Sequence, residues 1–325
     1  MTPQSLEEQL TKYLTDAHSI EQQALAQMKA APDLAGDEAI ASAFAAHLRE
    51  TQEHERRIRE CLAARDASPA ALKDIVGTIT GKGFVAFARS QPDTSGKLVA
   101  HAYSYEHMEQ AAYELIARLA ERAGETETAQ LARQIGAQEQ SMGERLQELF
   151  DAAAAVSIRE SGPEELVEQL QKYLADAHAL EAQALMLLAK GQKLAGAGSL
   201  AEAYGRHHEE TEGHSRMIEQ RLRSLGSKPS RVKDAALSLG ALNWGAFFAA
   251  QPDTPAKLAA FAYAFEHLEI AAYELLTRVA RAAGDAETEA LAGRILAEER
   301  AAAERLHSLF EEALDASLGA QGIPA

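Results

Sequence analysis

Two glutamates and a histidine lie in the short segment EHMEQAAYEL, residues 106–115, and they recur in EHLEIAAYEL, residues 266–275. The other residues of both segments are mostly good helix formers. In a helix, Glu106 and Glu109 share one face with Tyr113, because residues three and four apart are neighbours. Carboxylates that converge inside a protein are typical ligands of divalent cations such as iron and manganese. The segments therefore suggest a metal site.

The chain consists of two copies of one unit, because a shift of 160 residues aligns it with itself without a gap. KYLTDAHSIEQQAL at residues 12–25, for example, returns as KYLADAHALEAQAL at residues 172–185. Each copy is long enough to fold around a core of its own. We therefore predict two domains, residues 1–160 and 161–325.

Helix-breaking residues divide each copy into four long helices. In the first copy, Pro32 and Gly36 follow the first helix, Pro69 follows the second, and Gly124 ends the third. The predicted helices span approximately residues 5–29, 38–64, 95–123 and 126–154. One long connection between two short ones is typical of ferritin-like bundles. The sequence thus predicts an all-α protein made of two tandem ferritin-like four-helix bundles, each with a long crossover between its second and third helices.

Charge and composition argue against several classes of protein. The formal net charge of −17 disfavours nucleic acids and anionic membranes as partners. No apolar run approaches the roughly 20 residues of a membrane-spanning helix. The N-terminal segment MTPQSLEEQL has neither the basic nor the apolar region of a signal peptide, so we expect a cytoplasmic protein. Cys61 is the sole cysteine and cannot form an intramolecular disulfide.

Glutamates recur on the helix faces that should point toward the axis of each bundle. These faces follow spacings of three and four residues along each helix. Every long helix has at least one glutamate near the middle of that face. In the first copy they are Glu21, Glu50, Glu106, Glu109 and Glu139, and in the second Glu181, Glu210, Glu266, Glu269 and Glu299.

Five buried carboxylates in one domain would be too costly without compensating charge. Burial of one unpaired carboxylate costs several kcal/mol, whereas a whole domain is stable by about 5–15 kcal/mol. The predicted faces carry no lysine or arginine. Two divalent metal ions per domain, iron or manganese, would offset most of the charge. The alternative for any single glutamate is a side chain that reaches solvent at the bundle edge.

Histidines and tyrosines extend the predicted site. His54 lies one turn after Glu50, so both can reach one ion, and His214 is the counterpart of His54. His47 and His207 are either further ligands or partners of a ligand carboxylate. Tyr113 and Tyr273 are core residues whose hydroxyls need a partner, or groups that act beside the metals. The candidate catalytic residues are Glu109, Glu269, Tyr113 and Tyr273.

Four motifs resemble those of the YciE/YciF-type ferritin-like proteins of bacterial stress responses. They are DAHSIEQQAL, HLRETQEH, YEHMEQAAYEL and the stretch around Glu139, and the resemblance covers nearly all of each copy. It implies a rubrerythrin-like bundle with a dinuclear metal site, duplicated in tandem. It also implies that the two copies pack as an internal pseudo-dimer.

The fourth predicted helix departs from the wider ferritin-like pattern. Met142 stands where that pattern has a histidine, three residues after Glu139. Relatives of this type often carry paired glutamates here. The second copy keeps such a pair as Glu298-Glu299, whereas the first has Gln138-Glu139. The resemblance thus implies that the first site is the weaker one.

The leading functional hypothesis is a dinuclear iron or manganese protein that acts on peroxide, oxygen or Fe(II) in oxidative or general stress. Manganese-catalase-like, peroxidase and ferroxidase reactions are its versions. In this scheme Glu50 and Glu106 bridge the ions, Glu21 and Glu139 are terminal ligands, and His54 is a nitrogen ligand, with counterparts in the second copy. Glu109 and Glu269 are ligands or proton shuttles.

Non-enzymatic roles are the alternative. The protein could store metal, or it could be an interaction module in which metals only stabilise the bundle. A ferritin-type store would need a further homo-oligomer. The uncharged C-terminal segment ASLGAQGIPA is expected either to fray or to dock onto a partner protein.

Overall fold

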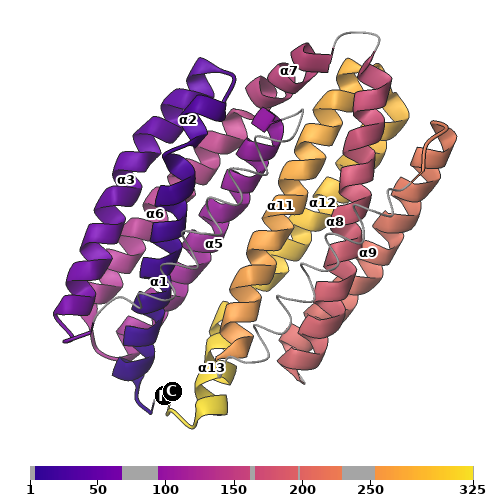
Figure 1. Cartoon of the computed structure of the whole chain (residues 1–325). Helices are drawn as coiled ribbons and strands as arrows, with labels where there is room; N and C mark the ends of the chain where they lie inside the picture. The colour runs from indigo at the N-terminus through magenta and orange to yellow at the C-terminus, as the bar shows by residue number, and fades with distance from the viewer. Residues whose placement is uncertain (1–3, 68–93, 162–164, 197, 229–252, 325) are drawn as a thin grey trace. The chain divides into compact units, whose positions relative to one another are not determined.

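The computed structural model describes residues 4–67, 94–161, 165–196, 198–228 and 253–324 (Figure 1). Within these ranges all regular elements are helices, which confirms the predicted all-α class. The chain divides into two compact units, the first of residues 1–160 with 318–325 and the second of residues 161–317. None of the helices in the described ranges is both long and apolar enough to cross a bilayer.

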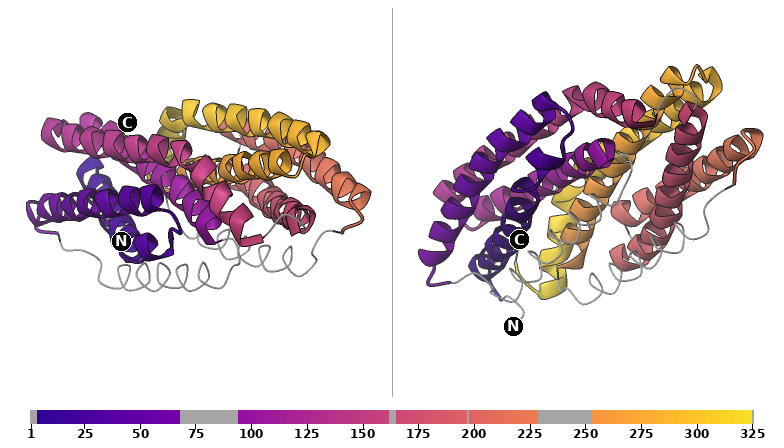
Figure 2. Two further views of the ribbon diagram at one scale, coloured as in Figure 1. Left: turned by 90° about the horizontal axis from the view of Figure 1, so that it is seen from above. Right: turned by 45° about the horizontal axis from the view of Figure 1, so that its top comes forward.

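Four long helices of the first unit surround one interior. They are α1 (Leu6–Met28), α3 (Glu38–Ala63), α5 (Thr94–Arg122) and α6 (Thr126–Glu148). Both α3 and α5 pack against α1, and both also pack against α6, so the four helices form a closed ring (Figures 1 and 2). The short helices α2 (Ala31–Leu34) and α7 (Phe150–Ser161) complete the unit.

The second unit repeats this plan. Its long helices are α8 (Leu166–Ala195), α9 (Ser199–Ser224), α11 (Thr254–Ala282) and α12 (Ala286–Ser308). The short helix α13 (Phe310–Gln321) follows α12. Here α9 and α11 pack against both α8 and α12. Helix α8 is longer than α1, because Gln192 replaces Pro32, which lacks the amide hydrogen that a continuing helix needs.

Side-chain caps begin the first two long helices close to the predicted residues. Ser5 Oγ accepts a hydrogen bond from the amide of Glu8 at 3.2 Å, and Asp37 Oδ1 accepts one from the amide of Ala39 at 2.9 Å. Such caps satisfy amide groups that have no partner within the helix. Serine and aspartate before an apolar periodic run are therefore reliable signals for these boundaries.

Contacts at the two ends of the first bundle confirm the long crossover. Ser95, at the start of α5, donates from Oγ to the carbonyl of Ala35, which lies just before α3, at 2.6 Å. At the opposite end Arg65, just after α3, forms an ion pair with Glu125, just after α5. Helices α3 and α5 therefore run in the same direction, so the end of α3 and the start of α5 lie at opposite ends of the bundle. The predicted crossover segments, residues 68–93 and 229–252, lie outside the described residues.

The prediction of one continuous helix over residues 126–154 is wrong. Helix α6 ends at Glu148, and Leu149 closes a tight turn by donating its amide to the carbonyl of Leu146 at 3.0 Å. The turn allows Phe150 to be fully buried against Tyr103, with ring centroids 5.4 Å apart. Burial of an aromatic ring outweighs one helical turn, and no glycine or proline marks the break in the sequence.

The expectation that the C-terminal segment frays is also wrong as far as Pro324. Helix α13 continues to Gln321, and Gly322 ends it with a positive φ of 70°. The amide of Ile323 donates to the carbonyl of Leu318 at 3.0 Å, the bond of a Schellman cap. Leu318 and Ile323 are both buried, as that cap favours. Docking through this segment remains a prediction.

Candidate metal centre

Six ionisable side chains meet inside the first unit. They are Glu21 on α1, His47 and His54 on α3, Glu106 and Glu109 on α5, and Glu139 on α6. Each side chain lies near mid-helix on the face toward the other helices, and all six residues are at most 1% exposed. Buried ionisable groups are rare unless they are paired or bind a metal, so this cluster calls for a compensating charge.

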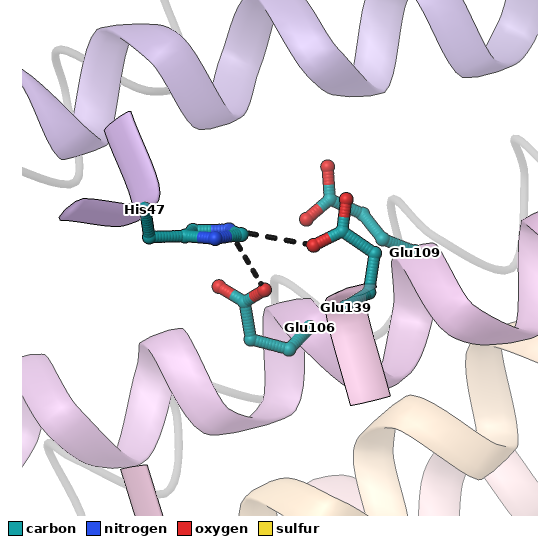
Figure 3. Close-up of side chains that lie close together, drawn as sticks. All are labelled: His47, Glu106, Glu109 and Glu139. Carbon is teal, nitrogen blue, oxygen red and sulfur yellow. Dashed lines mark ion pairs between the residues drawn. The ribbon is translucent and has the colours of Figure 1, made fainter. Parts of the chain in front are cut away.

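The first group in this cluster contains His47, Glu106, Glu109 and Glu139, whose nearest donor atoms all lie within 4.8 Å of one another. His47 points across the bundle from α3 toward the carboxylates of α5 and α6 (Figure 3). Its Nε2 lies 3.0 Å from Glu106 Oε2 and 3.4 Å from Glu139 Oε2. Three carboxylates and one imidazole thus face one another closely enough that they could hold one ion.

The second group contains Glu21, His54 and Glu139. His54 Nδ1 lies 2.7 Å from Glu139 Oε1 and 3.8 Å from Glu21 Oε1. Glu139 therefore belongs to both groups and turns a different oxygen toward each histidine. A carboxylate in this position can bridge two ions.

The second unit contains the same two groups in equivalent positions. They are His207, Glu266, Glu269 and Glu299, and Glu181, His214 and Glu299. None of these residues is more than 3% exposed. His207 Nε2 lies 2.8 Å from Glu266 Oε2, and His214 Nδ1 lies 2.8 Å from Glu299 Oε1. Here Glu299 takes the shared position.

The unsatisfied oxygens of these carboxylates fit a metal site. Both oxygens of Glu106, Glu109 and Glu139 are buried and have no hydrogen-bond partner among the described residues. Some lie close to a histidine nitrogen but without the alignment of a hydrogen bond. Within the described ranges, no lysine or arginine pairs with these three carboxylates or with Glu21. Donors that face a common point without bonding one another suit a cation, so the buried groups of each unit could hold a metal ion.

Without a cation, several of these side chains have raised pKa values. Burial and the neighbouring Glu139 raise the pKa of Glu21 to about 8. Burial likewise raises the pKa of Glu106 to about 7 and that of Glu109 well above its usual 4.5. Burial alone would lower the pKa of His47, but the adjacent Glu106 carboxylate outweighs it and raises that pKa well above 6.5. Metal binding at neutral pH must therefore displace protons.

Comparison with known proteins agrees with this architecture. Both halves of the chain match a family model described as Domain of unknown function (DUF892), over residues 5–158 and 165–319. The chain belongs to the DUF892 family. DUF892 is a ferritin-like family, and this chain carries two of its domains in tandem. No curated protein and no solved structure is significantly similar to the chain.

Glu50 and Glu210, predicted as ligands on the buried faces, lie outside the two groups of their DUF892 domains. The Glu50 side chain is 35% exposed, and its Oε2 lies 2.9 Å from His47 Nδ1. Glu210 is bound in the same way to His207, at 3.1 Å, and also to Arg305. The histidines thus point their other nitrogen into the site, and these glutamates hold them from outside. Glu50 therefore lies in neither group, and its bridging of two ions stays a prediction.

The spacing on α3 explains this difference. His47, Thr51 and His54 are buried and follow the four-and-three spacing of one helix face. Glu50 is three residues from His47 in the other rotational sense, at the edge of that face. Glu50 lies three residues after His47 and four before His54, so its spacing also fits a place on the buried face. The sequence alone therefore does not decide whether Glu50 lies inside the bundle or at its edge.

Several further predicted residues find partners in the DUF892 domains. The hydroxyl of Tyr113 donates to Glu21, and that of Tyr273 donates to Glu181. His107 on α5 and His267 on α11 are a further pair of equivalent histidines. Each has Nδ1 2.7 Å from a main-chain carbonyl one turn earlier on its own helix, and neither belongs to a ligand group.

The substitution Glu50→Gln tests whether Glu50 is a ligand or an outer partner. We expect about a 10–100-fold loss of metal affinity in the first DUF892 domain but continued binding, because outer partners of metal-bound histidines have effects of this size. Competition against a chromophoric chelator measures it. Glu53→Gln is the matched control, since Glu53 lies on the same helix and pairs with Arg56 at the surface. Complete loss of one ion in the Glu50 variant would instead make Glu50 a ligand.

Proposed function

We propose that each DUF892 domain binds two divalent ions, iron or manganese, and acts as a dinuclear centre on peroxide, oxygen or Fe(II). The observation that carries this proposal is the set of buried carboxylate oxygens, present in both domains, for which the described part of the chain offers no hydrogen-bond partner. Carboxylate and imidazole ligands in this ratio suit iron and manganese, whereas structural zinc sites favour cysteine.

Two ions per domain are proposed because each domain has two groups of ligands that share one carboxylate. In the first domain, His47, Glu106 and Glu109 would hold one ion and Glu21 and His54 the other, with Glu139 between them. A bound pair of redox-active metals supplies the two-electron exchange that a small oxidant such as peroxide requires.

The remaining chemistry is assigned to the side chains themselves. Neither oxygen of Glu109 has a hydrogen-bond partner among the described residues, and burial raises its pKa in the metal-free site. Glu109 therefore serves either as a ligand or, where it is not bound to an ion, as a group that holds and releases a proton. The hydrogen bond from Tyr113 to Glu21 orients that carboxylate. Burial of the whole cluster excludes bulk water, which strengthens these interactions.

The proposal also includes the cellular role, partners and location of the protein. The motif resemblance to YciE/YciF-type proteins supports a role in oxidative or general stress. The net charge of −17 supports a small oxidant or a metal ion, rather than nucleic acid or a membrane, as the partner. A cytoplasmic location is proposed with it.

Assays of the full chain loaded with Fe(II) or Mn(II) test the proposed activity. We expect peroxide consumption or Fe(II) oxidation that is absent from the metal-free chain. The double variant Glu139→Gln with Glu299→Gln lacks both shared carboxylates and should be inactive. A chain that binds these metals but neither consumes peroxide nor oxidises Fe(II) would instead be a metal store or an interaction module with structural metals.

A further inference from the structure

Each ligand histidine has a second partner at its other ring nitrogen. For three of the four, this outer partner is a carboxylate. The separations are 2.9 Å for His47 and Glu50, 3.1 Å for His207 and Glu210, and 2.7 Å for His214 and Glu298. These contacts create the carboxylate–histidine–metal arrangement that orients a ligand imidazole.

His54 is the exception. Its Nε2 lies 3.1 Å from the amide oxygen of Gln138, the residue equivalent to Glu298. The ligands themselves are matched, because His54 and His214 are both fully buried and both have Nδ1 within 2.8 Å of the shared glutamate. The difference between these two ligand groups therefore lies in one outer residue.

An ionised carboxylate and an amide act differently on an imidazole. A carboxylate only accepts hydrogen bonds, so it fixes the proton on the outer nitrogen and leaves the lone pair of the inner nitrogen for a metal. Its charge also makes the imidazole a stronger ligand. An amide is neutral and can turn its NH₂ group toward the ring, which would put the proton on the inner nitrogen. Gln138 thus favours the metal-binding tautomer of His54 less strongly than Glu298 favours that of His214.

We propose that the residue at positions 138 and 298 sets the metal affinity of the adjacent site, and that the position formed by Glu21, His54 and Glu139 is the weakest in the chain. This inference rests on the metal binding in the proposed function. The chain should release one ion well before the others, and its two domains should therefore differ in metal content when metal is scarce.

Competition of the full chain with a chromophoric chelator for Mn(II) tests this inference. In the wild type, one position should bind about 10–100-fold more weakly than the rest. Gln138→Glu should bring this position up to the others, and Glu298→Gln should create a second weak position. Gln130→Glu is the control, because it adds the same charge at an exposed site on the same helix. It should keep the wild-type pattern.

The possible outcomes separate this inference from the proposed function. If the wild type binds all its ions with equal affinity, or if Gln138→Glu leaves the weak position unchanged, the inference is overturned while metal binding stands. If no variant and no wild-type chain binds Mn(II) or Fe(II), the proposed function fails first. Circular dichroism shows whether each variant folds. Should Glu298→Gln unfold, the gain of affinity in Gln138→Glu decides the matter alone.

Discussion

If each domain binds two ions as proposed, replacement of Glu139 with glutamine should remove both from the first domain and leave those of the second. Glu139 is the only described residue in both ligand groups of that domain, with one oxygen 2.7 Å from His54 and the other 3.4 Å from His47. Glutamine keeps the volume but loses the charge and one of the two oxygens. We expect elemental analysis after a chelator wash to show half the metal content of the wild type.

Two further variants serve as a counterpart in the second domain and as a control. Glu299→Gln should empty the second domain in the same way, because Glu299 takes the shared position there. Glu144→Gln alters an exposed glutamate on the same helix as Glu139 and should change nothing. Loss of a single ion from Glu139→Gln would show that another residue, such as Glu106, bridges the metals, as the sequence had suggested.

The metal-free protein should become less stable as the pH rises from about 5 to 8. The pKa of Glu21 is raised from 4.5 to about 8 and that of Glu106 to about 7, in both cases chiefly by burial. Between those values the folded state keeps protons that the unfolded state has released, so the free energy of unfolding falls with pH. The raised pKa of His47 acts in the same direction above pH 6.5. The combined loss should be on the order of a few kcal/mol.

Bound metal should reverse this dependence. Cations replace the retained protons and bind more tightly as the pH rises, so the stabilisation by metal should be larger at pH 8 than at pH 6. Denaturant unfolding with a chelator and with excess Mn(II), at each pH, measures both effects. Glu109→Gln should flatten the metal-free profile, because it removes a buried carboxyl with a raised pKa. A metal-free profile without slope in the wild type would show that these carboxyls are ionised or solvated.

Much of this architecture follows from periodicity and breakers in the sequence. Glu21, Glu106, Glu109 and Glu139 lie at regular positions near mid-helix, so the spacing rule alone placed them inside the bundle. The same rule misplaced Glu50. At the edge of a helix face, a small rotation of the helix about its axis decides whether a side chain lies in the interior or at the surface. That choice depends on how α3 is turned against α5 and α6, which is a property of packing. The turn before Phe150 was likewise not predictable from the sequence, because it depends on the tertiary contact between Phe150 and Tyr103.

The shared role of Glu139 could not be read from spacing either. A sequence gives the face on which a side chain lies, but not which of its two oxygens approaches which histidine. The difference between Gln138 and Glu298 was visible in the sequence, yet its physical meaning required the hydrogen bonds to His54 and His214.

The depth of the ligand side chains has a consequence for kinetics. Because the six candidate ligands of the first domain are at most 1% exposed, we expect an ion to reach them only when the helices separate transiently. The rate of metal uptake should then be limited by transient opening of the bundle rather than by diffusion of the ion, and mild denaturant should increase it. Once captured, an ion would be held for as long as the bundle remains closed, so the ion in residence would reflect which metal was abundant when the chain folded.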